Sequence, residues 1–202
     1  MKCRIPVYGV VSLWLLFVHA CAHVGIGADT KVRYPIESFL PLAVGNEWIY
    51  ATRFQAEPQA DLRVSIIKEE GGYFYDDRPS PSRMRFDNVG LRDGEIRYLL
   101  KRPMMRGQKW MSVADVKTVE RYEIEKTGQE VRVPAGAFGD CVIVRMEVKL
   151  DKNRAMLTYF TFAPAVGIIE IRTILKTGAD LHEQSTLQLK SYHLTTTHRA
   201  TP

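Results

Sequence analysis

The chain has 202 residues, of which 46% are hydrophobic, 10% aromatic and 25% charged, and its formal net charge is +5. This composition is typical of a globular protein and excludes a disordered, collagen-like or multispanning membrane chain. Once a signal segment of about 20 residues is removed, the remainder suits one domain or one large β-fold. Three cysteines are too few for a small domain held together by disulfides.

The N-terminal segment has the pattern of an export signal. Lys2 and Arg4 form a positive region, and a mostly apolar run of 12 residues extends from Val7 to Val18. A helix needs about 20 apolar residues to span a bilayer, so this run is too short to be a membrane span. Residues 1–20 are therefore predicted to be a signal peptide.

Cys21 follows the predicted signal directly, in the segment Val18-His19-Ala20-Cys21. This segment resembles a bacterial lipobox, although His19 stands where a small residue is usual, and the resemblance implies a lipid on Cys21. Residue 22 is Ala and not Asp, which by similarity to Gram-negative lipoproteins implies an outer-membrane anchor facing the periplasm. The alternative is signal-peptidase cleavage after Ala20-Cys21-Ala22, which would give a soluble periplasmic or secreted protein.

The state of the other cysteines depends on whether Cys21 is lipidated. Cys3 leaves with the signal, and acylation of Cys21 leaves Cys141 alone. If Cys21 is retained without a lipid, a Cys21–Cys141 disulfide can form in an oxidising compartment. Cys141 opens a strand-like run, where a thiol is more often a small buried hydrophobe than a nucleophile.

The mature chain divides into three predicted parts. Residues 21–40 form the lipid anchor and a tether with an irregular or short helical entry, residues 41–193 a β domain, and residues 194–202 a flexible tail. Alternation with period two marks the strands, as in residues 141–150, where Val142, Val144, Met146, Val148 and Leu150 share one face. One apolar and one polar face per strand is typical of antiparallel sheets. The predicted fold is mainly β, a single antiparallel, strongly curved sheet or open half-barrel of about ten strands with little helix.

Turn signals recur between the strand-like runs. They are Gly71-Gly72, Asp93-Gly94, Thr127-Gly128, Lys152-Asn153 and Gly178-Ala179. Dipeptides of this kind join the strands of hairpins.

One sequence pattern occurs twice. Residues 41–48 and 103–110 both read P-x-x-x-G-x-x-W. Pro and Gly set a turn, and the Trp then enters a strand. The repeated pattern is consistent with two related halves of a sheet, and it is equally consistent with chance.

Three segments resemble a family of uncharacterised bacterial secreted proteins and lipoproteins. The segments are Phe39–Tyr50, Val133–Cys141 and Ala163–Gly167, which stand for the family patterns F-P-L-x-V-G-N-x-W-x-Y, V-P-A-G-x-F-x-x-C and A-P-G-V-G. Leu40 is an insertion in the first pattern, and Ala165 replaces the central Gly of the last. The resemblance implies a β-rich envelope protein and brings no activity and no catalytic residues.

No pattern of an enzyme or a metal site is present. His182-Glu183 begins like H-E-x-x-H but lacks the second His, and the sequence contains no G-x-S-x-G, P-loop, dinucleotide fingerprint or C-x-x-C. The protein is therefore predicted to be no enzyme, with no cofactor and no metal.

Positive charge gathers in one segment. Between Arg78 and Lys109, nine Lys and Arg stand against three Asp and Glu, a net charge of +6. This is either a solvated basic face with strand-edge cations that discourage aggregation, or a surface for anionic lipid, cell-wall polymer or an acidic envelope protein. Nucleic acid is disfavoured by the exported location. The candidate interaction residues are Arg78, Arg83, Arg85, Arg97, Lys101, Arg102, Arg106 and Lys109.

Aromatic residues offer a second candidate site. A curved sheet with aromatics on its concave side can hold a lipid, although such residues are more often ordinary core. The candidates for an apolar ligand face are Trp48, Tyr98, Trp110, Phe160 and Phe162.

Two functions follow from these candidates. The first is a non-enzymatic envelope lipoprotein that acts as a binding or assembly module, for which charge reversal at Arg102 and Arg106 should weaken partner binding and leave the fold intact. The alternative is a periplasmic carrier or sensor of a lipid or other apolar ligand.

Overall fold

The computed structural model of the chain describes residues 32–113 and 118–195. The predicted signal peptide, the predicted lipidation site Cys21 and most of the predicted tail lie outside these residues.

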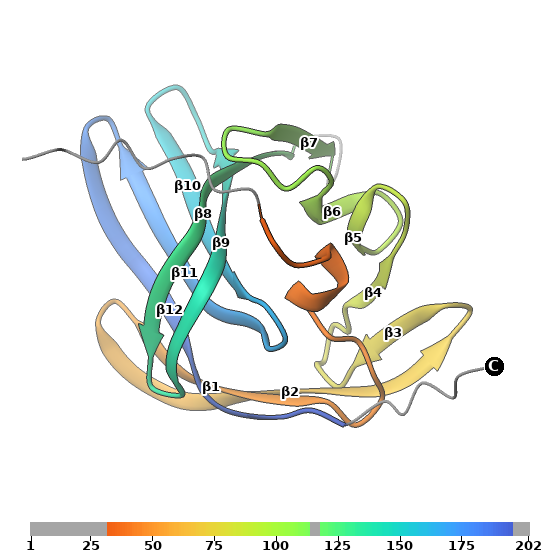
Figure 1. Cartoon of the computed structure of the whole chain (residues 1–202). Coiled ribbons are helices and arrows are strands. Elements are labelled where there is room, and N and C mark those ends of the chain that lie inside the picture. The colour runs from red at the N-terminus through yellow and green to blue at the C-terminus, as the bar shows by residue number, and fades with distance from the viewer. Residues whose placement is uncertain (1–31, 114–117, 196–202) are drawn as a thin grey trace, which may run out of the picture.

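The described residues form one antiparallel sheet of twelve strands in the order β6-β5-β4-β3-β2-β1-β12-β11-β10-β9-β8-β7 (Figure 1). Every strand is therefore hydrogen-bonded to its neighbour in the sequence, and β1 also pairs with β12. The strands are β1 (Glu47–Phe54), β2 (Glu57–Glu70), β3 (Tyr73–Asp76), β4 (Arg83–Phe86), β5 (Gly90–Asp93), β6 (Arg97–Lys101), β7 (Lys109–Val113), β8 (Val119–Val133), β9 (Gly136–Lys149), β10 (Arg154–Ala163), β11 (Gly167–Thr177) and β12 (Asp180–His193).

The predicted fold class is confirmed. The sheet is mainly antiparallel and so strongly curved that it wraps around the short 3-10 helix η1 (Ile36–Phe39) (Figure 1). It has twelve strands where about ten were expected, because β3, β4 and β5 are only four residues long. So few residues do not repeat an alternation often enough to be read as separate strands.

Alternation sets the inner and outer faces of the sheet. In β9, Val142, Val144 and Met146 are buried, while Arg145 and Glu147 lie on the opposite face. Leu150 is 49% exposed because β9 ends before it.

One predicted turn is wrong. Four of the turn dipeptides join consecutive strands, but Thr127-Gly128 lies inside β8, which continues to Val133. The pairing of β8 with β9 is irregular there, and Gly128 has a φ of 66°. A glycine at positive φ inside a strand is typical of a bulge, which a turn signal resembles.

The sheet consists of two meanders of six strands, β1–β6 and β7–β12. The repeated P-x-x-x-G-x-x-W segments stand at the start of these halves and have the same local structure. In residues 41–48, the N–H of the motif glycine and the carbonyl of the next residue both bond Ile66, at 2.8 Å each. In residues 103–110, the same two groups bond Ile124 at 2.7 and 2.9 Å. The repeated pattern therefore forms equivalent turns that lead into β1 and β7.

Residues just before β1 fill the interior. Ile36, Phe39 and Leu40 are buried in the core, and Ala165 N–H donates to the Ser38 carbonyl at 2.8 Å. The packed core thus includes residues that lie ahead of residue 41, where the β domain was predicted to begin. At the other end, Thr195 N–H donates to Asn46 Oδ1 at 2.8 Å.

Two segments of the family resemblance meet at this core. Trp48 Nε1 donates to the Val166 carbonyl at 2.7 Å, and a Cβ on Gly167 would come within 3.0 Å of Leu40. Ala165 has a φ of 61°, so it adopts a conformation that glycine takes without strain.

The sheet is nearly closed where its edge strands β6 and β7 approach each other. Side chains bridge this seam, since Trp110 Nε1 donates to the Tyr98 carbonyl at 2.9 Å. Arg97 Nε of β6 also lies 3.0 Å from both Glu120 and Tyr122 of β8.

Candidate functional site

The candidate aromatic face belongs to the core. Trp48, Trp110, Phe160 and Phe162 are buried, and Tyr98 packs against the same cluster. Ile36 and Phe39 of η1 belong to this cluster too. A ligand on the concave face would therefore have to displace η1 from the interior.

Most of the candidate basic residues are held by carboxylates. Arg78 lies 2.6 Å from Asp76, Arg97 3.1 Å from Asp93, and Lys109 3.7 Å from Glu123. Arg83 pairs with Glu95. The basic segment is thus much less positive at its surface than its sequence suggests.

Arg102 has a structural role. Its guanidinium donates to the Asp87 carbonyl at 2.7 Å and pairs with Glu37 of η1. Charge reversal at Arg102 would disturb this contact as well as change the surface charge. Among the described residues, the candidate cations without a carboxylate partner are Arg85, Lys101 and Arg106.

Cations and tyrosines alternate across the outer face of β3–β6. Arg85 of β4 stands directly opposite Arg92 of β5, and Arg92 opposite Tyr98 of β6. The guanidinium of Arg85 lies 4.5 Å from the ring centre of Tyr73, and the ammonium of Lys101 4.7 Å from that of Tyr98. These distances are within the range of cation–π attraction.

Asp87 borders this face at the end of β4. Its Oδ2 accepts a bond from Tyr98 Oη at 2.9 Å and lies 3.8 Å from Arg92. Burial alone would raise the pKa of Asp87, but the hydrogen bonds from Gly90, Val89 and Tyr98 hold it below its usual value. The carboxylate therefore stays ionised and fixes the Tyr98 ring.

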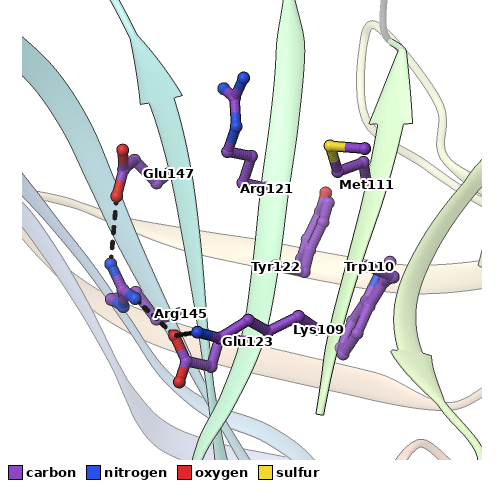
Figure 2. A pocket seen from close by; sticks show the side chains of 8 residues that line it. All are labelled: Lys109, Trp110, Met111, Arg121, Tyr122, Glu123, Arg145 and Glu147. Carbon is purple, nitrogen blue, oxygen red and sulfur yellow. Dashed lines mark hydrogen bonds and ion pairs between the residues drawn. The ribbon is translucent and has the colours of Figure 1, made fainter. Parts of the chain in front are cut away.

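A pocket of about 400 Å³ lies beside β7, β8 and β9 (Figure 2). In Figure 2, Arg145 reaches Glu147 on one side and Glu123 on the other. Arg145 lies 3.2 Å from Glu147 and 2.6 Å from Glu123, which Lys109 also approaches. The pocket is lined by Lys109, Trp110, Met111, Arg121, Tyr122, Glu123, Arg145 and Glu147.

The carboxylates of this pocket are committed to ion pairs. Burial would lower the pKa of Arg145, but the hydrogen bond and charge of Glu123, with the charge of Glu147, raise it above its usual value. A guanidinium charged at all pH values of interest holds both carboxylates, so the arrangement favours a rigid polar surface over proton transfer. Within residues 32–113 and 118–195, no group of three His, Cys, Asp or Glu is placed to hold a metal ion.

Cys141 is expected to resist alkylation in the folded protein. Its thiol is fully buried, and burial raises its pKa to about 11, so at pH 8 it stays protonated. Iodoacetamide at pH 8 should leave Cys141 unmodified, while the same reagent in urea should label it completely. Peptide mapping by mass spectrometry distinguishes it from the other cysteines, and rapid labelling of native Cys141 would contradict its burial.

The sequence did not predict the contacts that several of these residues make across neighbouring strands. Arg92 was counted only as part of the basic segment, and Arg121 and Glu123 were not considered. Their cross-strand neighbours depend on register, which the sequence of a single strand does not reveal. The only available signal was the charge on alternate positions of the strands.

Comparisons with known proteins give a distant likeness in fold. No family model matches the chain, and no curated protein matches it. One similar structure is that of a candidate exported protein of Bacteroides fragilis with a YmcC-like fold. The alignment covers 77% of this chain and 99% of that protein, with 15% identity and a TM-score of 0.46. A candidate lipoprotein of Parabacteroides distasonis covers 77% of this chain with 98% of its own, at 12% identity and a TM-score of 0.43. These values are too low to transfer a function.

The described part of the chain contains no helix that is long and apolar enough to cross a membrane.

Proposed function

We propose that the protein is an exported, non-enzymatic lipoprotein of the bacterial envelope whose β domain is a binding or assembly module. Cys21 carries the lipid and anchors the protein in the outer membrane, facing the periplasm. Ten residues separate Cys21 from Val32, so the domain stays within about 40 Å of the bilayer.

The partner surface is the outer face of β3–β6. One observation carries this assignment, namely that Arg85 and Lys101 stack on tyrosines and have no carboxylate partner among the described residues. The neighbouring Arg78, Arg83 and Arg97 are neutralised within the domain. Within the basic segment, Arg85 and Lys101 therefore leave positive charge on this face, which favours an anionic partner, either an acidic envelope protein or anionic lipid.

The packing of the interior supports a binding module over a lipid carrier. Trp48, Phe160 and Phe162 share the core with η1. A carrier would need this space for its ligand.

Photo-crosslinking in cells tests the proposal. A photoreactive amino acid at Ile96, 59% exposed in the turn between β5 and β6, should give a discrete adduct with an envelope component. The matched control is Leu181, 60% exposed at the start of β12. Lys101→Glu should weaken the Ile96 adduct severalfold, because it reverses the charge that attracts the partner.

Two results would overturn the proposal. One is the absence of any adduct at Ile96, and the other is an adduct pattern at Ile96 that matches Leu181 and does not respond to Lys101→Glu.

A further inference from the structure

We propose that Arg85 and Arg92 form a binding site for a phosphate group on the outer face of β4 and β5, with Tyr73 and Tyr98 as its walls. This inference rests on the proposed function, because it names the chemistry that the same face recognises.

Like charges stand opposite each other at this site. Arg85 and Arg92 are cross-strand partners in the pairing of β4 with β5. Directly opposite residues in an antiparallel pair have Cβ atoms about 5 Å apart, and like charges in this position destabilise the sheet. Elsewhere in the basic segment, Arg78 and Arg97 have carboxylates at 2.6 and 3.1 Å. An anion bound between Arg85 and Arg92 would remove the repulsion.

Both arginines also have a donor without a partner. The Nε atoms of Arg85 and Arg92 are buried from solvent and make no hydrogen bond. Arg85 has no ion pair within the described residues, and the only carboxylate near Arg92 is Asp87 at 3.8 Å. Buried donors are normally satisfied, and an unsatisfied one destabilises the fold. The described residues therefore do not fully satisfy the two opposing guanidinium groups.

The tyrosines hold the guanidinium groups in position. Arg85 lies 4.5 Å and Arg83 5.3 Å from the ring centre of Tyr73. Arg92 lies 5.8 Å from the ring centre of Tyr98, whose hydroxyl is fixed by Asp87. The N–H groups of a guanidinium lie in its own plane. When its flat face stacks on a tyrosine ring, these groups can therefore still donate hydrogen bonds.

Phosphate fits the charge and the geometry. Two guanidinium groups carry a charge of +2, and a phosphate monoester carries about −1.5 to −2 at pH 7 with three strong acceptor oxygens. Its three acceptor oxygens can bond both guanidinium groups at once. Asp87 is already engaged by the Val89 and Gly90 N–H groups, so it does not bridge to Arg85.

The test uses the complete mature chain with Cys21→Ser, which removes the lipid and its own membrane affinity. Inorganic phosphate should raise the thermal midpoint and bind in calorimetry, while chloride at equal ionic strength should do neither. Arg85→Met removes one of the two guanidinium groups and should weaken phosphate binding at least about tenfold. It should leave the apo midpoint unchanged or higher, because it also removes the repulsion, whereas loss of a purely structural arginine would lower it.

Arg106→Met is the matched control. Like Arg85, Arg106 has no carboxylate partner in the described residues, but it is exposed and lies in the loop between β6 and β7. This variant should bind phosphate like the parent chain. A phosphate response no larger than that to chloride, or equal binding by Arg85→Met and the parent, would overturn the site.

Vesicles distinguish the source of the phosphate. Phosphatidylglycerol vesicles that bind the chain, and release it with phosphate or Arg85→Met, assign the site to a lipid headgroup. Phosphate binding without vesicle binding assigns it to a soluble phosphorylated ligand, and either result supports the site. If phosphate fails to bind while the Ile96 adduct persists, the phosphate site is wrong and the proposed function stands.

Discussion

Gly90→Ala is expected to unfold the domain or to lower its free energy of unfolding by at least about 3 kcal/mol, the upper end of the usual cost of overpacking. A Cβ at Gly90 would lie 2.0 Å from the Leu100 carbonyl oxygen and 2.9 Å from the Lys101 Cα. Both atoms belong to the backbone of β6, so they cannot move away without separating β5 from β6. Urea unfolding followed by circular dichroism measures the loss.

Gly139→Ala is the matched control for this substitution. A Cβ at Gly139 would meet no atom within 4 Å, and Gly139 does not have a left-handed φ. Alanine there should change stability by less than about 1 kcal/mol. If Gly90→Ala were as stable as the parent, the close approach of β5 to β6 would be incorrect.

Trp48→Ala should cost about 3–5 kcal/mol of unfolding free energy, as expected for a large aromatic removed from a packed core. Trp48 is buried beside Leu40 and Gly167, and its indole N–H donates to the Val166 carbonyl at 2.7 Å. Trp48→Phe retains much of the apolar area but leaves that carbonyl without its donor, so it should cost about 1–3 kcal/mol.

Phe54→Ala serves as the comparison within the same strand. Phe54 is 51% exposed at the end of β1, so its truncation should cost less than about 1 kcal/mol. Chemical denaturation of the three variants ranks the effects. Equal losses for Trp48→Ala and Phe54→Ala would contradict the packing of Trp48 in the core.

The regular parts of the fold were predictable because they are local. Period-two alternation marks β9 through Val142, Val144 and Met146, and Gly71-Gly72 and Gly178-Ala179 mark hairpins. The failure at Gly128 has a local cause as well, since a bulge and a turn both select glycine at positive φ.

The candidate site was predictable only as a region. The density of Arg and Lys between residues 78 and 109 indicated a basic surface, and Arg85 and Lys101 are part of the proposed one. The same count included Arg97 and Arg102, which are held by Asp93 and Glu37. Sequence counts charges but not their partners, because an ion pair between strands depends on pairing over distances that the local pattern does not encode.

The sequence by itself determined the β class, the antiparallel pairing of neighbours and the position of most turns, since each depends on residues close together in the chain. The export signal and the lipid on Cys21 also come from sequence alone and stay predictions, because they lie outside the described residues. Only the tertiary structure decided that Ile36 and Phe39 fill the interior, that two equivalent turns start two halves, and that Arg85 faces Arg92. These features arise from strand register and sheet closure, which bring together residues that no local pattern relates.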